Sequence, residues 1–320
     1  MWRRPFPWLV VAVALGVALV PYWTDDVELR EGLVLAAVYV ILASNLNLMI
    51  GYAGYVNFGN IVFFGLGGYV GVYLVSEWHW PLLPAAIAGG LAVSAVALLF
   101  GLGILRLRGA FFALATIGIN EAVRQLVTNF EPWGGATGIY LSFDAYAPLG
   151  GPMQALWLAY FLIVAVMALS LLASYAIRNS KFGLGLLAIG QNEDAAATLG
   201  VPTPLFKALV YSASAMLPAV AGAIYFFKLG IIEPTGAFNL GLSIEAIVMV
   251  MLGGQGTVIG PALGAFLYEE LRGALLTTEA FSHFQLVIAG ALLLLIVLFV
   301  PGGLMGFVRR RWPRLRWWLE

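Results

Sequence analysis

Residues 81–105 read PLLPAAIAGGLAVSAVALLFGLGIL, a run without a single charged side chain. A helix needs about 20 mostly apolar residues to cross the hydrocarbon core of a bilayer. Of the 320 residues in the chain, 62% are hydrophobic and 10% are charged, whereas about 25% are charged in a typical soluble domain. Because so few charges cannot cover a water-facing surface, the sequence predicts an all-α integral membrane protein.

The same pattern recurs along the chain and predicts a polytopic transmembrane helical bundle of about ten spans. The candidate spans are 7–23, 32–50, 58–76, 81–105, 109–129, 154–176, 206–227, 257–276 and 283–300, with the shorter segment 241–253 as a half-span or re-entrant piece. The first span follows Arg3 and Arg4 as in a secretory signal, but no small-x-small cleavage site follows it. We interpret it as uncleaved, and residues 1–320 as one transmembrane domain.

Positive charge sets the expected orientation, because Lys and Arg collect in cytoplasmic loops. Arg3 and Arg4 precede the first span, and a basic tail at 308–320 follows the last. Both termini are therefore expected in the cytoplasm, which requires an even number of spans and favours counting 241–253. The loops assigned outside carry mostly acids, although Arg30 and Lys228 also fall there.

Several function classes are disfavoured by composition. The net charge is zero, so nothing suggests a nucleic-acid partner. The chain has no cysteine and two widely separated histidines, which makes a metal site improbable. No GxxxxGK[ST] phosphate loop occurs, and the longest polar-leaning stretch, 177–206, is too short for an ATP-hydrolysing domain. The chain is thus expected to be no enzyme, and any ATP hydrolysis must belong to another chain.

One predicted cytoplasmic loop, 178–205, contains a short amphipathic segment. Leu186, Ile189, Ala196 and Leu199 fall near helical spacing, and Gly200 is a natural stop, which predicts one helix over 186–200. Such a helix either lies on the membrane surface or docks into a groove on a partner. The absence of Lys and Arg between Phe182 and Thr203 favours the partner.

The run Asn192-Glu-Asp-Ala-Ala-Ala-Thr-Leu-Gly200 resembles the EAA-type coupling loop of ABC-importer permeases, in particular those of branched-chain amino acid importers. Three further blocks are similar to the same family: 51–69, 106–116 with Glu121 and Arg124 after it, and 243–264. The resemblance covers about residues 35–300. Within the family the chain looks like the permease type with the longer N-terminus.

This resemblance implies a permease subunit, multi-pass in the bacterial inner membrane, that holds no cofactor of its own. It implies two cytoplasmic ATP-binding subunits carrying ATP-Mg, a second homologous permease and a periplasmic solute-binding protein, besides membrane lipid. It also implies that residues of the coupling loop transmit ATPase closure to the spans: Asn192, Glu193, Ala195, Ala196 and Gly200. One departure is that Leu184, Leu187 and Gly190 stand where the family commonly has arginines.

Two glycine-rich junctions, 51–59 and 253–260, are candidates for the translocation path. Glycine permits broken helices, which in transporters often bind a substrate's charged ends. The candidate residues are Asn45, Asn47, Gly51, Gly54, Asn57, Gly253, Gly254 and Gly256. Tight turns with close packing are the alternative for the glycines, and bonds across helices for Asn45 and Asn47.

Glu121 and Arg124 are charged residues within a predicted span and lie three positions apart on one helix face. An ion pair inside the membrane is a functional candidate, although a structural pair is favoured here because each charge neutralises the other. The sequence predicts import of small polar solutes, and the resemblance points to branched-chain or hydrophobic amino acids. A urea or short-amide importer stays open, as do two other classes, an ion-coupled secondary transporter and a membrane-embedded enzyme.

Overall fold

The computed structural model describes residues 6–24, 26–276, 287, 291 and 302–306, the last three residues of the 26–276 segment by their backbone alone. Apart from residues 287 and 291, the predicted span 283–300 lies outside the described residues, as does the basic tail 308–320.

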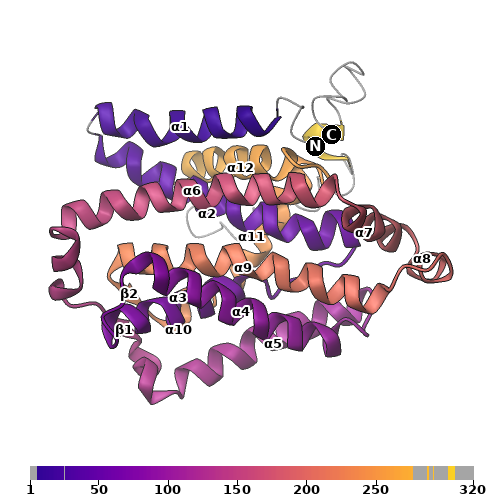
Figure 1. Cartoon of the computed structure of the whole chain (residues 1–320), viewed down its shortest axis with the longest axis horizontal. Coiled ribbons are helices and arrows are strands. Elements are labelled where there is room, and N and C mark those ends of the chain that lie inside the picture. The colour runs from indigo at the N-terminus through magenta and orange to yellow at the C-terminus, as the bar shows by residue number, and fades with distance from the viewer. Residues whose placement is uncertain (1–5, 25, 277–286, 288–290, 292–301, 307–320) are drawn as a thin grey trace.

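Helices dominate the described part of the chain (Figure 1). The α-helices are α1 (Phe6–Thr24), α2 (Val27–Asn47), α3 (Asn60–Ser76), α4 (Leu82–Ile104), α5 (Ala110–Thr128), α6 (Pro152–Arg178), α7 (Lys181–Gln191), α8 (Glu193–Thr198), α9 (Thr203–Leu229), α10 (Pro234–Ala237), α11 (Leu240–Gly253) and α12 (Gly260–Leu276). The other elements are a π-helix (Leu48–Ala53), short 3₁₀ turns (Glu131–Trp133, Gly135–Thr137 and Phe143–Leu149), and strands β1 (Ile139–Tyr140) and β2 (Ile231–Ile232).

Seven helical segments among the described residues are long and apolar enough to cross a membrane. They are α1, α2 with its π-helix, α4, α5, α6, α9, and α10 joined with α11 over Pro234–Gly253. The apolar helix α3 is slightly shorter, at 17 residues. The long helices run along the long axis of the molecule (Figure 1). The predicted all-α polytopic bundle is confirmed, and the segment 241–253 reaches spanning length by joining α10.

The core lies around α2 and α9. The apolar window of α2 is 83% buried and that of α9 72%, against 22% for α1 and α5. Small residues bring α9 close to its neighbours: a Cβ on Gly67 of α3 would overlap the backbone of Ala219, and one on Gly222 would overlap Phe64. In lipid, such small residues let helices pack backbone to backbone. Gly67 and Gly222 therefore serve helix packing here.

The two ends of the bundle differ in charge. Arg106, Arg108, Arg178 and Lys181 gather where α4 meets α5 and α6 meets α7, and we call this the basic end. The opposite end, the acidic end, carries Asp26, Glu28, Glu77, Glu131 and Asp144. There β1 and β2 pair antiparallel, with Ile139 opposite Ile232, and tie the loop after α5 to the loop after α9.

Both extremities of the described chain lie at the basic end. The ring of Phe6, at the start of α1, stacks on Tyr175 near the end of α6, with centroids 4.7 Å apart. A Cβ on Gly254, after α11, would meet Met305 at 2.9 Å. An even number of crossings would produce this arrangement.

Candidate coupling site and translocation path

Two short helices cover the basic end in place of the single helix predicted over 186–200. That prediction is wrong because Asn192 adopts an extended conformation, with φ −160° and ψ 110°, and ends α7. Its side chain then caps α8 by accepting a hydrogen bond from the Ala195 amide at 3.0 Å. An asparagine cap offers the backbone an alternative to the helical hydrogen bond, and this signal could have been read from the sequence.

Gly200 stops α8, as predicted. Its φ is +89°, a left-handed conformation that glycine adopts without a Cβ penalty. The amides of Gly200 and Val201 donate to the carbonyls of Ala197 and Ala196, at 3.0 and 3.1 Å. This pair of bonds is the Schellman motif.

The α7–α8 pair buries one apolar face against the bundle and exposes the other. Leu186, Ile189 and Ala196 are buried, whereas Leu184 is 64% and Leu199 83% exposed. Leu199 was expected on the buried side, and the break at Asn192 is what turns it outward. Gly190 lies against the bundle: a Cβ there would come within 2.6 Å of the Tyr52 carbonyl oxygen. An arginine side chain, common at this place in the family, has no room here.

Glu193 points into the protein and is the centre of a charged cluster. Its carboxylate accepts hydrogen bonds from the Lys207 ammonium at 2.7 Å and from the Tyr55 hydroxyl at 2.6 Å. The Arg108 guanidinium lies 3.4 Å away. Only 14% of the Glu193 side chain and 4% of the Lys207 side chain are exposed. We call these four residues the Glu193 clamp.

The clamp joins four separate segments at the basic end. Lys207 belongs to α9, Tyr55 to the first glycine junction, Arg108 to the turn before α5, and Glu193 to α8. Lys207 also donates to the Leu105 carbonyl, at 2.6 Å, where α4 ends. These contacts fasten α8 to α9, to the end of α4 and to the chain between α2 and α3.

Glu193 is ionised at neutral pH. Burial alone raises the pKa of the Glu193 carboxyl, but hydrogen bonds from Lys207 and Tyr55 and the charges of Lys207 and Arg108 outweigh it, so the pKa falls below its ordinary value. Burial, helped by the hydrogen bond to Glu193, raises the pKa of the Tyr55 hydroxyl. Glu193 is thus a carboxylate and Tyr55 a neutral donor.

Sequence reasoning placed Glu193 at a partner contact and missed its internal partners. A lysine at the start of an apolar helix needs a carboxylate partner, and this signal pointed to Lys207. The neighbouring Asp194 is the exposed acid of the pair: it binds Arg108 through two hydrogen bonds of 2.9 and 3.2 Å, and its side chain is 78% exposed.

The two glycine junctions, distant in sequence, lie against each other at the basic end. The Asn47 side chain donates to the Thr257 carbonyl at 2.8 Å and accepts from the Gly256 amide at 2.9 Å. A Cβ on Gly51 would overlap both Asn47 and Gly256. The Arg178 guanidinium donates to the Gly256 carbonyl at 2.9 Å.

The remaining path candidates are also engaged in packing. A Cβ on Gly253 would overlap the Gly260 carbonyl, and Gly54 faces Gly190 of α7, with its own φ at +76°. Asn57 accepts from the Gly59 amide at 2.9 Å. Asn45 donates to Ser170 of α6 at 3.1 Å and to the Ile41 carbonyl. The geometry therefore favours the alternatives, close packing and bonds across helices, over a path through these residues.

Glu121 and Arg124 form the predicted pair on α5. The Arg124 Nε donates to Glu121 at 2.9 Å, and Gln125 donates to the same carboxylate at 3.0 Å. The side chains are 52% and 33% exposed, so the pair lies on the outer face of this subunit and not in its core.

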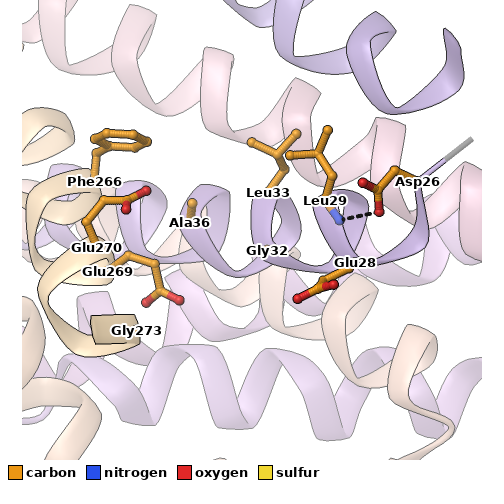
Figure 2. A pocket seen from close by; sticks show the side chains of 10 residues that line it. All are labelled: Asp26, Glu28, Leu29, Gly32, Leu33, Ala36, Phe266, Glu269, Glu270 and Gly273. Carbon is orange, nitrogen blue, oxygen red and sulfur yellow. Dashed lines mark hydrogen bonds between the residues drawn. The ribbon is translucent and has the colours of Figure 1, made fainter. Parts of the chain in front are cut away.

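A hollow of about 900 Å³ opens between α2 and α12 (Figure 2). Four carboxylates line it: Asp26, Glu28, Glu269 and Glu270. Asp26 already caps α2 by accepting from the Leu29 amide at 3.0 Å, and Glu269 pairs with Arg272 at 3.7 Å. We assign no ligand to this hollow.

A bundle of apolar helices of spanning length, with a short helical pair fastened to one end by charge, is the architecture of a polytopic membrane permease. The chain belongs to the family of permease components of branched-chain amino acid transport systems, whose model matches residues 29–297. The recognition made from the coupling loop and the glycine blocks is therefore confirmed. Members of this family are transport subunits and not enzymes.

Individual relatives agree with the family. The high-affinity branched-chain amino acid transport system permease protein LivM of Escherichia coli K12 is 27% identical over 338 residues, covering 96% of this chain and 76% of the relative. The permease protein LivH of the same strain is 24% identical over 306 residues, covering 87% and 94%. The ribose import permease protein RbsC of Bacillus subtilis is 27% identical over 194 residues, 58% of each chain. No solved structure matches the chain.

Proposed function

We propose that this chain is the subunit through which an ATP-driven importer moves branched-chain amino acids across the bacterial inner membrane, and that α7 and α8 receive the force of ATP hydrolysis. The observation that carries this proposal is the Glu193 clamp. It makes α8 one mechanical unit with α9 and with the ends of α2 and α4, while the opposite face of the helical pair stays exposed.

The exposed face suits a protein partner. Leu184 and Leu199 stand out from it, and Asp194 beside them is paired with Arg108. An apolar surface on short helices docks into a groove on a partner. The proposed occupant is a cytoplasmic ATP-binding subunit, one for this chain and one for a second, homologous permease. A periplasmic binding protein would deliver the solute at the other end.

The charges of the two ends support this orientation. The basic end, with α7 and α8, would face the cytoplasm, and the acidic end the periplasm. The two cations expected outside, Lys228 and Arg30, share the carboxylate of Glu31 as a partner. Both termini would then be cytoplasmic.

A matched pair of substitutions tests the proposed docking face. Leu199→Asp changes a residue that is 83% exposed on the proposed ATPase face, and Phe143→Asp one that is 82% exposed at the acidic end. Burying a leucine contributes about 1.5–3 kcal/mol, or roughly 10- to 150-fold in affinity. Co-purification of the ATP-binding subunits should fall by this factor for Leu199→Asp and stay normal for Phe143→Asp.

Uptake measurements separate the rival classes. Labelled leucine should enter proteoliposomes holding the assembled importer only with ATP and binding protein, and excess ribose or urea should not compete. Uptake that stops when the ion gradient collapses while ATP remains would contradict the importer and favour a secondary transporter. Competition by urea or ribose would instead show that the importer carries a different class of substrate.

A further inference from the structure

A second hollow, of about 370 Å³, lies between α5 and the junction of α10 with α11. Its polar lining consists of Asn120, Glu121 and Arg124 from α5, and of Thr235 and Asn239 from the junction. These elements adjoin in the lower half of Figure 1. No function has yet been given to the Glu121–Arg124 pair, and it belongs to this hollow.

The hollow lies on the outer face of the subunit, roughly halfway along the length of α3 and α5. The Phe238 ring, between α10 and α11, stacks parallel on Tyr69 of α3 with centroids 5.9 Å apart, and a Cβ on Gly65 would meet the Ala237 carbonyl at 2.7 Å. At 1.5 Å per residue, Gly65 and Tyr69 lie roughly 8 and 14 Å along α3. Glu121 lies roughly 17 Å along α5 by the same rise.

The helix facing α5 is broken at this depth. α10 ends at Ala237 and α11 begins at Leu240, with Asn239 accepting from the Gly241 amide at 2.9 Å. Irregular backbone inside a membrane is tolerated only within protein or beside a water-filled cavity. In transporters, substrate sites form at broken helices near the bilayer midplane.

The polar groups of the hollow have unused capacity. Asn120 is 3% exposed, and its amide donates to the Phe238 carbonyl at 3.1 Å while its Oδ1 has no hydrogen-bond partner. Glu121 and Arg124 present a carboxylate and a guanidinium side by side, each partly exposed. Facing hydrocarbon, an exposed ion pair would be costly, so this face of α5 meets water or protein.

We propose that this hollow is a contact site for the transported solute and that it takes a zwitterion. Arg124 would receive the carboxylate, Glu121 the ammonium, and Asn120 would supply the buried hydrogen-bond acceptor beside them. A paired anion and cation match the two charges on neighbouring atoms of an amino acid, whereas a sugar carries neither. This inference rests on the proposed function and moves the solute path from the glycine junctions to α5.

The first experiment removes the charges of the pair in the reconstituted importer. Glu121→Gln and Arg124→Gln should each lower leucine uptake at least tenfold, and stimulation of ATP hydrolysis by the loaded binding protein should stay within twofold. Glu77→Gln is the control, because Glu77 is an exposed carboxylate at the acidic end and does not line the hollow. It should transport normally.

A double variant, Glu121→Leu with Arg124→Met, separates a solute site from a structural pair. Replacing both partners of an ion pair by apolar residues is often neutral for structure. Uptake within twofold of normal in this variant would overturn the proposal. The proposed function itself would fail if the unchanged chain showed no ATP-dependent uptake at all. That outcome is distinguishable from failure of the solute site, because it is measured without any substitution.

The second experiment uses the absence of cysteine in the chain. Thr235→Cys places a thiol in the hollow, and Tyr140→Cys places one at the acidic end, on a residue that is 65% exposed. In the assembled importer, leucine-loaded binding protein should slow thiol labelling at 235 several-fold more than leucine-free binding protein does, with no such difference at 140. Equal labelling at 235 with and without leucine would overturn the proposal.

Discussion

Replacing Glu193 with glutamine should release α8 from the bundle. Among the described residues, Glu193 is the only charged group within hydrogen-bond distance of Lys207, whose side chain is 4% exposed. The change leaves the ammonium with neutral oxygens alone, including those of Leu105 and Tyr55. Removing one partner of a buried ion pair costs about 3–5 kcal/mol. For Glu193→Gln we use the lower value, about 3 kcal/mol, because part of the Glu193 side chain still contacts solvent.

A cost of about 3 kcal/mol corresponds to roughly a hundredfold increase in the open form of α8, since about 1.4 kcal/mol is tenfold. Amide hydrogen exchange of residues 195–198 in the assembled importer measures this opening directly. Leucine uptake per ATP hydrolysed should fall in parallel, because an unfastened α8 no longer moves α9. Glu193→Lys, which places a third cation beside Lys207 and Arg108, should uncouple transport further while the protein stays inserted.

Two variants make this prediction specific to the clamp. Asp194→Asn breaks only the exposed pair with Arg108, which contributes less than about 1 kcal/mol. Amide exchange of residues 195–198 in this variant should therefore stay near the normal rate. The double variant Glu193→Gln with Lys207→Met should recover part of the loss, because no buried charge remains unpaired. The clamp hypothesis is refuted if the amides of residues 195–198 exchange at the same rate in Glu193→Gln and in Asp194→Asn.

Two further predictions concern the glycine junctions and pH. Gly51→Ala should destabilise the protein by about 1–3 kcal/mol, because the added methyl group overlaps Gly256. Gly103→Ala should be neutral or slightly stabilising, because nothing lies within 4 Å of the added methyl group. Equal thermal unfolding midpoints for the two variants in detergent would contradict the packing role of Gly51. The lowered pKa of Glu193 means that the clamp is complete above the ordinary glutamate pKa of about 4.3 and is lost only as the pH falls through the lower folded value. Exchange at α8, corrected for intrinsic rates, should therefore be flat between about pH 6 and 8, and a loosening within that range would mean that another group titrates.

The sequence determined the class of this protein. Long uncharged runs such as 81–105 have one stable solution, a helix in lipid, because backbone groups there must bond within their own segment. The coupling loop and the glycine blocks identified the family, and Gly200 marked the end of α8. These features are local, so their consequences could be read along the chain.

The tertiary structure decided what the polar residues do. Glu193 meets Tyr55 across 138 positions of sequence, and Asn47 meets Thr257 across 210. No periodicity encodes such distances, and so the sequence could not show which residues Asn47 would contact. The break between α10 and α11, which places Asn239 opposite Glu121, likewise depends on how Phe238 packs against α3. The composition of the chain shows that its helices lie in lipid. Which buried charges pair is decided only when the helices pack together, because each buried charge must then find a partner.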